Sequence, residues 1–227
     1  LSNSQYIIRD NYRLDNPLMN NWLNAYSKSE GKHLIQRKLD LLSILGCNTN
    51  DSSMRIPVLY TPANKTNGMI RIGFQMGASE AKRCWPVARF AELATQLCQK
   101  SHYQVVLIGG LKDQNLVNHF NSLLDSALLP RIENHVGTTS LIELLTLIDG
   151  LDVLVTGDTG PLHLAIALQT ATVSLYADAE PAHTGPYQDL SNHSILKIVN
   201  ELPGVGQPLE QIEAETVKKE IVRLLAQ

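Results

Sequence analysis

One loop of this sequence is better suited than any other to bind a phosphorylated ligand. It is the run TGDTG at 156–160, which follows the apolar run 153–155 and precedes a proline that suits the first turn of a helix. Its glycines allow a close backbone approach, and a helix N-terminus carries about half a positive charge, so a diphosphate is a natural ligand. Asp158 or Thr159 could equally serve only as a helix cap, and His163 could either donate to a phosphate or pack as a polar residue.

A second loop combines small residues with cations. Ala78 and Ser79 follow an apolar run, and Lys82 and Arg83 come shortly after them. Small residues permit backbone approach, a hydroxyl can donate, and both cations can neutralise a phosphate. The alternative is a basic surface loop ahead of a helix.

Two further loops offer weaker signals. Asp113 follows a pair of glycines and could accept hydrogen bonds from ribose hydroxyls, or cap the next helix. Thr139 lies just before Ser140, which has Glu143 three residues on, the spacing of a capping box. Helix capping is therefore the default role of that segment.

Other kinds of site are disfavoured. The sequence has no GxGxxG after its first strand, no P-loop lysine motif and no GxSxG motif. The seven histidines lack metal-ligand spacing. Three cysteines lie far apart without a CxxC, which favours a reducing compartment and argues against disulfides.

Charge and hydropathy exclude further classes. The net charge is −3 over 227 residues, with lysine and arginine scattered, so a general nucleic-acid binder is not expected. No apolar run reaches the roughly 20 residues that a spanning helix needs, and residues 1–5 do not resemble a signal peptide.

The elements that must position these loops alternate after Gly68. Short apolar runs predict strands at 69–74, 104–108, 132–136, 151–155, 171–176 and 194–199. Amphipathic runs predict helices at 86–100, 113–124, from 140, 161–168 and 209–225. Strands buried on both faces and separated by helices indicate a parallel sheet, so we predict an α/β, Rossmann-like domain.

The first 68 residues differ in character. Leu18, Trp22 and Tyr26 recur at the spacing of one helix face, and residues 32–46 give a second helical stripe that ends at a glycine. The polar and proline-containing stretch that follows reads as a linker. We therefore expect a mainly helical N-terminal segment at 1–68 and the Rossmann-like domain at 69–227.

Five ordered motifs cover roughly residues 69–190. In order along the chain they are GAS with KRCWP and FAEL (77–93), VVLIGG (105–110), GTTSLIEL (137–144), DTGPLHLA (158–165) and TGPY (184–187). Together they resemble the family of ADP-heptose:lipopolysaccharide heptosyltransferases, glycosyltransferase family 9.

The resemblance implies a GT-B enzyme with an N-terminal acceptor domain and a C-terminal nucleotide-sugar domain. It implies that residues 69–227 form the donor-binding half, and that 1–68 are the remnant of the acceptor domain with its linker. On this expectation the chain binds nucleotide but turns over poorly. The implied reaction transfers a heptose, or a related sugar, from a nucleotide diphosphate to a lipopolysaccharide core with inversion, without a metal or other cofactor.

The resemblance also assigns donor-binding roles. Stabilisation of the departing diphosphate is the main chemical task. The implied donor-binding set is Ala78, Ser79, Lys82, Arg83, Asp113, Gln114, Thr139, Asp158, Thr159, Gly160 and His163. Within it, Asp113 or Gln114 would approach the ribose and Thr139 the adenine. No general base is assigned, because Asp10 and Asp15 lie in no matching motif.

The sequence departs from the family pattern at two places. The family's lysine two residues before the tryptophan is Arg83 here, with Lys82 shifted by one. The family's GPT after the fourth strong strand is here ADA at 177–179. The new carboxylate, Asp178, could change the donor site or its sugar preference.

The implied partners are a nucleotide-sugar donor, with ADP-heptose as the first candidate, and a lipid-linked saccharide acceptor. The resemblance also implies a cytoplasmic location and is compatible with peripheral contact at the cytoplasmic face of the inner membrane. The alternatives are a non-catalytic nucleotide or sugar-phosphate binding module, and an epimerase or phosphorylase on the same scaffold.

Overall fold

The computed structural model describes residues 8–10, 25–27, 33–65, 68–198 and 207–227. Its elements fall into two compact units. The first comprises Leu1–Ser53 with Glu180–Gln188, and the second Met54–Ala179 with Asp189–Gln227. Each unit is described by itself below.

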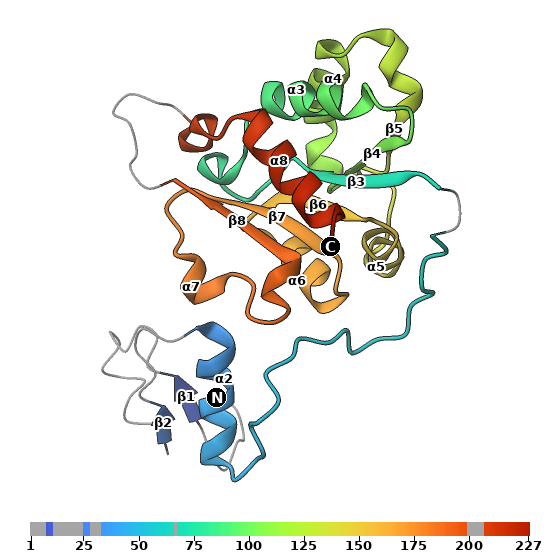
Figure 1. Ribbon diagram of the computed structural model, residues 1–227. Coiled ribbons are helices and arrows are strands. Elements are labelled where there is room, and N and C mark those ends of the chain that lie inside the picture. Colours follow the sequence, from blue (N-terminus) through green and yellow to red (C-terminus); the bar gives the residue numbers. More distant parts are fainter. Residues whose placement is uncertain (1–7, 11–24, 28–32, 66–67, 199–206) are drawn as a thin grey trace. The chain divides into compact units, whose positions relative to one another are not determined.

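The second unit is built on a six-stranded, wholly parallel sheet (Figure 1). The strands stand in the order β5-β4-β3-β6-β7-β8. Their bounds are β3 Ile70–Gln75, β4 Tyr103–Ile108, β5 Ile132–Asn134, β6 Val153–Gly157, β7 Ala171–Tyr176 and β8 His193–Lys197. In sequence order this is the arrangement 3-2-1-4-5-6 of a doubly wound fold, so the predicted fold class is confirmed.

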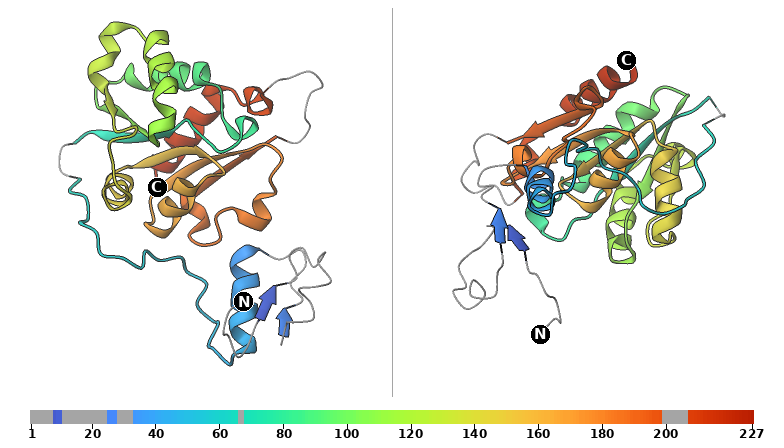
Figure 2. Two further views of the ribbon diagram at one scale, coloured as in Figure 1. Left: turned by 180° about the vertical axis from the view of Figure 1, so that it is seen from behind. Right: turned by 90° about the horizontal axis from the view of Figure 1, so that it is seen from below.

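Helices cover both faces of this sheet (Figures 1 and 2). One face carries α3 Val87–Cys98, α4 Gln114–Leu123 and α8 Ala214–Leu225. The other carries α5 Leu141–Asp149 and α6 Gly160–Ala167. Short 3-10 helices lie at Ala81–Arg83, Leu111–Asp113, Ser126–Arg131, Leu190–Asn192 and Pro208–Gln211.

Strand alternation divides the core into two layers. Val105 and Leu107 of β4 pack in the layer under α3 and α8, whereas Val106 and Ile108 pack in the layer under α5 and α6. All four side chains are at most 1% exposed. Successive side chains of a strand point to opposite faces, so a strand covered on both sides reads as the continuous apolar run seen in the sequence.

The predicted helix starts and ends agree with local chemistry. Pro86 is the N-cap residue of α3, and Ser140 caps α5 through a capping box with Glu143. Trp85 is buried and donates its indole N–H to the carbonyl of Ile212 at 2.9 Å, which ties the start of α3 to the segment before α8. The C-terminal helix is shorter than predicted, because residues 208–211 form a separate 3-10 turn.

The first unit contains α2 Leu34–Ile44, α7 Pro181–Thr184, and the parallel pair β1 Ile8–Asp10 and β2 Ala25–Ser27. The helix predicted at 32–46 is confirmed, and Gly46 ends it with φ of 75°. The helix predicted from Leu18, Trp22 and Tyr26 is wrong at Tyr26, which lies in β2. Pairing with a distant strand outweighed a three-residue helical pattern, while Leu18 and Trp22 lie outside the described residues.

His33 organises the start of α2. Its Nδ1 accepts from the amide of Ile35 at 3.2 Å, and its Nε2 donates to the carbonyl of Gly185 at 3.0 Å. The imidazole also stacks on Tyr187 with ring centroids 4.3 Å apart. The TGPY motif therefore belongs, by its contacts, to the first unit, although it follows the fifth strand of the large sheet in sequence.

The described helices are all too short or too polar to cross a membrane.

The core of the second unit yields a stability prediction. Phe74 is fully buried and contacts the rings of Phe90 and Phe120. Phe74→Ala should lower the free energy of unfolding by about 3–5 kcal/mol through lost burial and a cavity. Leu59→Ala, at a side chain 97% exposed in the same unit, is the control and should change it little. Denaturant unfolding of both variants measures this, and equal midpoints would contradict the assigned core.

Candidate functional site

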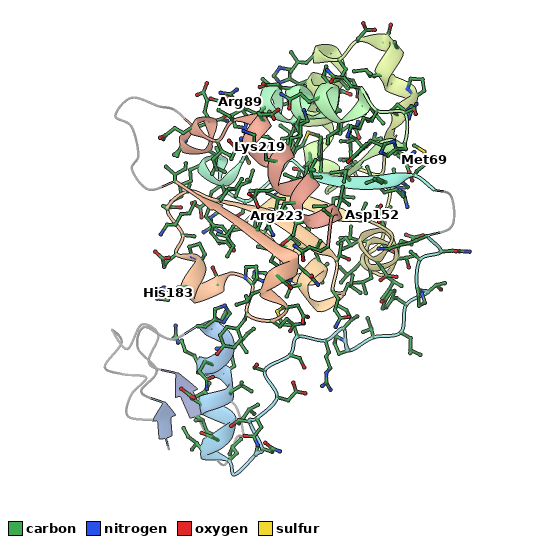
Figure 3. All side chains as sticks on the ribbon, in the orientation of Figure 1. Met69, Arg89, Asp152, His183, Lys219 and Arg223 are labelled. Atoms are coloured by element: carbon green, nitrogen blue, oxygen red, sulfur yellow. The ribbon has the colours of Figure 1, made fainter. Side chains whose placement is uncertain are left out.

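The predicted site residues all lie at one edge of the parallel sheet. Because every strand pair is parallel, the carboxyl ends of the strands meet along this edge. Figure 3 labels Met69 and Asp152, which precede β3 and β6 and mark the opposite, amino edge. The connections after β3, β4, β5 and β6 carry the predicted residues, listed as Ala78, Ser79, Lys82, Arg83, Asp113, Gln114, Thr139, Asp158, Thr159, Gly160 and His163.

The centre of this edge is a topological switch point. From β3 the chain proceeds outward through β4 and β5, and from the adjacent β6 it proceeds the other way through β7 and β8. Ligands of open α/β sheets bind where strand order reverses in this way. The loops of residues 76–83 and 158–159 flank that point, so the two strongest sequence signals are brought together.

The end of β6 is packed tightly against the loop after β3. A Cβ atom added at Gly157 would lie 2.6 Å from the carbonyl oxygen of Arg83. Real Cβ contacts essentially never come this close, so a glycine is needed here for the two loops to meet.

The turn into α6 is closed by two hydroxyls rather than by a helix cap. Thr159 is the N-cap residue, but its side chain makes no cap hydrogen bond. Its Oγ1 instead lies 2.9 Å from Oγ1 of Thr156. Pro161 has no amide hydrogen, and the amide of Leu162 donates to the carbonyl of Thr159. The exposed Gly160 and the positive end of the helix are therefore presented to solvent.

Charged side chains from different loops meet beside this turn. Arg83 Nη1 lies 3.9 Å from Asp158 Oδ2, and Arg83 Nη2 lies 3.3 Å from Glu80 Oε1. Lys82 Nζ lies 3.3 Å from Glu80 Oε2 and 2.6 Å from Asp178 Oδ2. Asp158 is the least exposed of these groups, at 13% of its side chain, so the cluster is deepest at the start of α6.

The pKa shifts in this cluster follow its ion pairs. Hydrogen bonding to Asp178 and then to Glu80 raises the pKa of Lys82. The hydrogen bond from Lys82 lowers the pKa of Asp178. Both groups are therefore charged at neutral pH.

Asp113 is buried and supports the neighbouring loops. Its side chain is 7% exposed, and Oδ2 accepts from the amide of Gly110 at 2.9 Å. A Cβ atom at Gly77 would lie 2.2 Å from its Oδ1. Asp113 is the N-cap residue of α4, but its side chain makes no cap hydrogen bond to that helix. Its carboxylate instead accepts from Gly110, the N-cap residue of the 3-10 helix Leu111–Asp113 that leads into α4, so the capping alternative holds for this short helix.

The other predicted residues reach the same edge without direct links. Gln114 is the first residue of α4, Thr139 precedes α5, and His163 lies half-buried on α6. Within the described part of the chain, no side-chain hydrogen bond or ion pair joins these three to another predicted site residue. Thr139 is not the N-cap of α5, because Ser140 takes that place.

Two buried polar groups at this edge were not predicted. Gln75, the last residue of β3, donates from Nε2 to the carbonyl of Gly77 at 3.0 Å, while its Oε1 has no hydrogen-bond partner. Tyr176, the last residue of β7, is fully buried with an unpartnered hydroxyl, and burial raises its pKa, with Asp158 as a second cause. Both lie inside apolar strand patterns, so no sequence signal distinguished them.

No group of three or more histidine, cysteine, aspartate or glutamate side chains in the described ranges is arranged to hold a metal ion.

The family model of glycosyltransferase family 9 (heptosyltransferase) matches residues 11–210. The chain belongs to this family. It is 33% identical over 165 residues to lipopolysaccharide heptosyltransferase 2 of Salmonella typhimurium, covering 69% of this chain and 47% of that protein. Lipooligosaccharide heptosyltransferase 2 of Haemophilus influenzae is 32% identical over 165 residues, with coverages of 68% and 47%. The chain thus spans about half the length of the curated relatives it matches.

Solved structures of this family have the same fold. The ADP-heptose LPS heptosyltransferase II of E. coli superimposes with a TM-score of 0.64 at 31% identity, covering 71% of this chain and 48% of that one. A family 9 glycosyltransferase from Veillonella parvula gives a TM-score of 0.77 at 22% identity, with coverages of 92% and 65%. The expected resemblance and the GT-B, Rossmann-like fold class are therefore confirmed.

The contact between Gly157 and Arg83 yields a prediction. Gly157→Ala should force the two central loops apart and lower the melting temperature, because the new methyl group would meet a backbone atom. Gly160→Ala is the matched control, since an added Cβ there has no atom within 4 Å. Thermal unfolding without ligand compares them, and equal melting temperatures would show that the two loops do not depend on this contact.

Proposed function

We propose that this chain supplies the donor-binding half of a heptosyltransferase that transfers a heptose from ADP-heptose to a lipopolysaccharide core. The observation that supports this most is the family's DTGPLHLA motif at the start of α6, with its uncapped helix end at the switch point of the sheet. The two curated relatives named above are heptosyltransferases, and the E. coli structure is named for ADP-heptose.

The proposed chemistry is displacement at the anomeric carbon. The bond between that carbon and the diphosphate oxygen breaks, and its electron pair leaves with the diphosphate. The acceptor hydroxyl oxygen forms the new bond to the same carbon, and its proton passes to a general base that is not among the donor-binding residues. Charge grows on the leaving diphosphate, so positive groups aimed at it lower the barrier.

The residues of the central loops fit these tasks. The positive end of α6 at Gly160, together with Arg83 and Lys82, would stabilise the diphosphate, and His163 would donate to it from the next turn. Asp158 would hold Arg83 and accept from sugar hydroxyls. In this proposal Arg83 and Lys82 supply the positive charge that a metal ion supplies in other transferases. Transfer proceeds with inversion at the anomeric carbon.

The outer loops would hold the nucleoside. Thr139 precedes α5 and would lie near the adenine, with Gln114 or Asp113 toward the ribose. Because Asp113 is buried and bonded to Gly110, we assign it the support of that loop and give the ribose contact to Gln114. Ala78 and Ser79 would lie behind the phosphates, and the turn of Thr159 would line their other side.

Nucleotide selectivity tests the proposed donor. Calorimetric titration of the chain should show binding of ADP in preference to UDP, GDP and NAD. Preferential binding of UDP or GDP would change the proposed base of the donor but not the assigned fold. Binding of none of the four would remove the nucleotide-binding proposal.

Three substitutions test the location of the diphosphate. Gly160→Ala should weaken ADP binding about tenfold or more while leaving the melting temperature unchanged, because its methyl group would occupy the open space above the helix end. Asp158→Ala and His163→Ala should each weaken ADP binding without unfolding the domain. His119→Ala, on the exposed surface of α4, is the control for His163. Unchanged affinity in the three site variants would place the diphosphate elsewhere.

A further inference from the structure

Five charged side chains form a continuous chain across the candidate donor site. In spatial order they are Asp178, Lys82, Glu80, Arg83 and Asp158, joined by contacts of 2.6, 3.3, 3.3 and 3.9 Å. They lie in the connections that follow β3, β6 and β7, which are neighbouring strands in the sheet. Three carboxylates thus face two cations at a place where an anion is proposed to bind.

This balance of charge is unfavourable for an anionic ligand. A diphosphate approaching the start of α6 meets cations that are already paired with carboxylates. It gains their full attraction only when one of those pairs opens. Arg83 is the more constrained cation, because it is held from two sides and its carbonyl packs against Gly157.

Lys82 is the cation that can change partner at the lowest cost. Its side chain is 47% exposed and that of Asp178 is 40% exposed, so their ion pair is solvated and weak. The lysine stem is long and flexible, and its ammonium has no required direction of approach. Asp178, by contrast, lies 96 positions from Lys82 in the sequence. Among the described residues, its ion pair with Lys82 is the only one that joins it to the loop after β3.

We propose that Asp178 competes with the donor diphosphate for the ammonium of Lys82. The ion pair between Asp178 and Lys82 opens when a diphosphate binds, so Asp178 lowers the affinity for the donor and for the nucleoside diphosphate product. This inference rests on the donor site proposed above. Asp178 thus sets how tightly the diphosphate group of the ligand binds, and it does not select the nucleoside base.

The competition predicts a coupling between the two residues. Asp178→Asn keeps the size of the side chain and removes its charge. It should tighten ADP binding about fivefold, the effect of one unit charge near 4 Å in water. In the Lys82→Met background the same change should alter ADP affinity less than about twofold, because the competed group is gone. AMP binding should change less than ADP binding in Asp178→Asn.

The experiment is calorimetric titration of the full 227-residue chain with ADP, AMP and inorganic pyrophosphate. It compares the wild type, Asp178→Asn, Lys82→Met and the double variant. Glu215→Gln is the matched control, since Glu215 is an exposed carboxylate paired with Lys218 at 3.3 Å on α8. Circular dichroism melts verify that each variant is folded.

Each outcome is decisive. Unchanged or weaker ADP binding in Asp178→Asn would overturn the competition, the weaker case showing that Asp178 holds Lys82 in place for the ligand. An equal gain in the Lys82→Met background would also overturn it, because the effect would then be general repulsion. If ADP fails to bind but pyrophosphate binds more tightly to Asp178→Asn, the nucleotide assignment falls and the competition stands. If neither probe binds any variant, both fall.

Discussion

The close approach of Gly157 to the carbonyl oxygen of Arg83 brings the last residue of β6 against the loop that follows β3. These two strands are neighbours at the point where strand order reverses. Any larger side chain at Gly157 would separate them. The position of Arg83 beside Asp158, and of the whole charged cluster at the start of α6, depends on this contact. A backbone constraint therefore underlies the candidate site more directly than any ion pair does.

The loops that follow β3 and β4 are also held together by one buried side chain, that of Asp113. Asp113 is a buried carboxylate whose environment is made of glycines, with Gly77 and Gly109 leaving the space that its side chain fills. Its hydrogen bond to the amide of Gly110 replaces the water that burial removes. The GAS and GG motifs looked like separate ligand-binding loops in the sequence. In the structure both pack against the side chain of Asp113.

Much of the fold could be predicted from the sequence because its signals are local. Continuous apolar runs predicted buried parallel strands, and Ser140 with Glu143 predicted a helix start that the structure shows as a capping box. Predictions failed where distant pairing decided the conformation, as at Tyr26 in β2. They were also silent on Gln75 and Tyr176, because a polar group at the end of an apolar strand looks like part of the strand pattern.

The sequence by itself determined the family, the order of strands and helices, and which loops carry small and charged residues, since motif order and periodicity are properties of the chain. Only the tertiary structure decided which of those residues are partners. Lys82 and Asp178 were two unrelated departures from the family pattern until parallel strands brought their loops to within 2.6 Å. Sequence reasoning could not pair them, because the contact joins residues 96 positions apart and depends on which strands are neighbours.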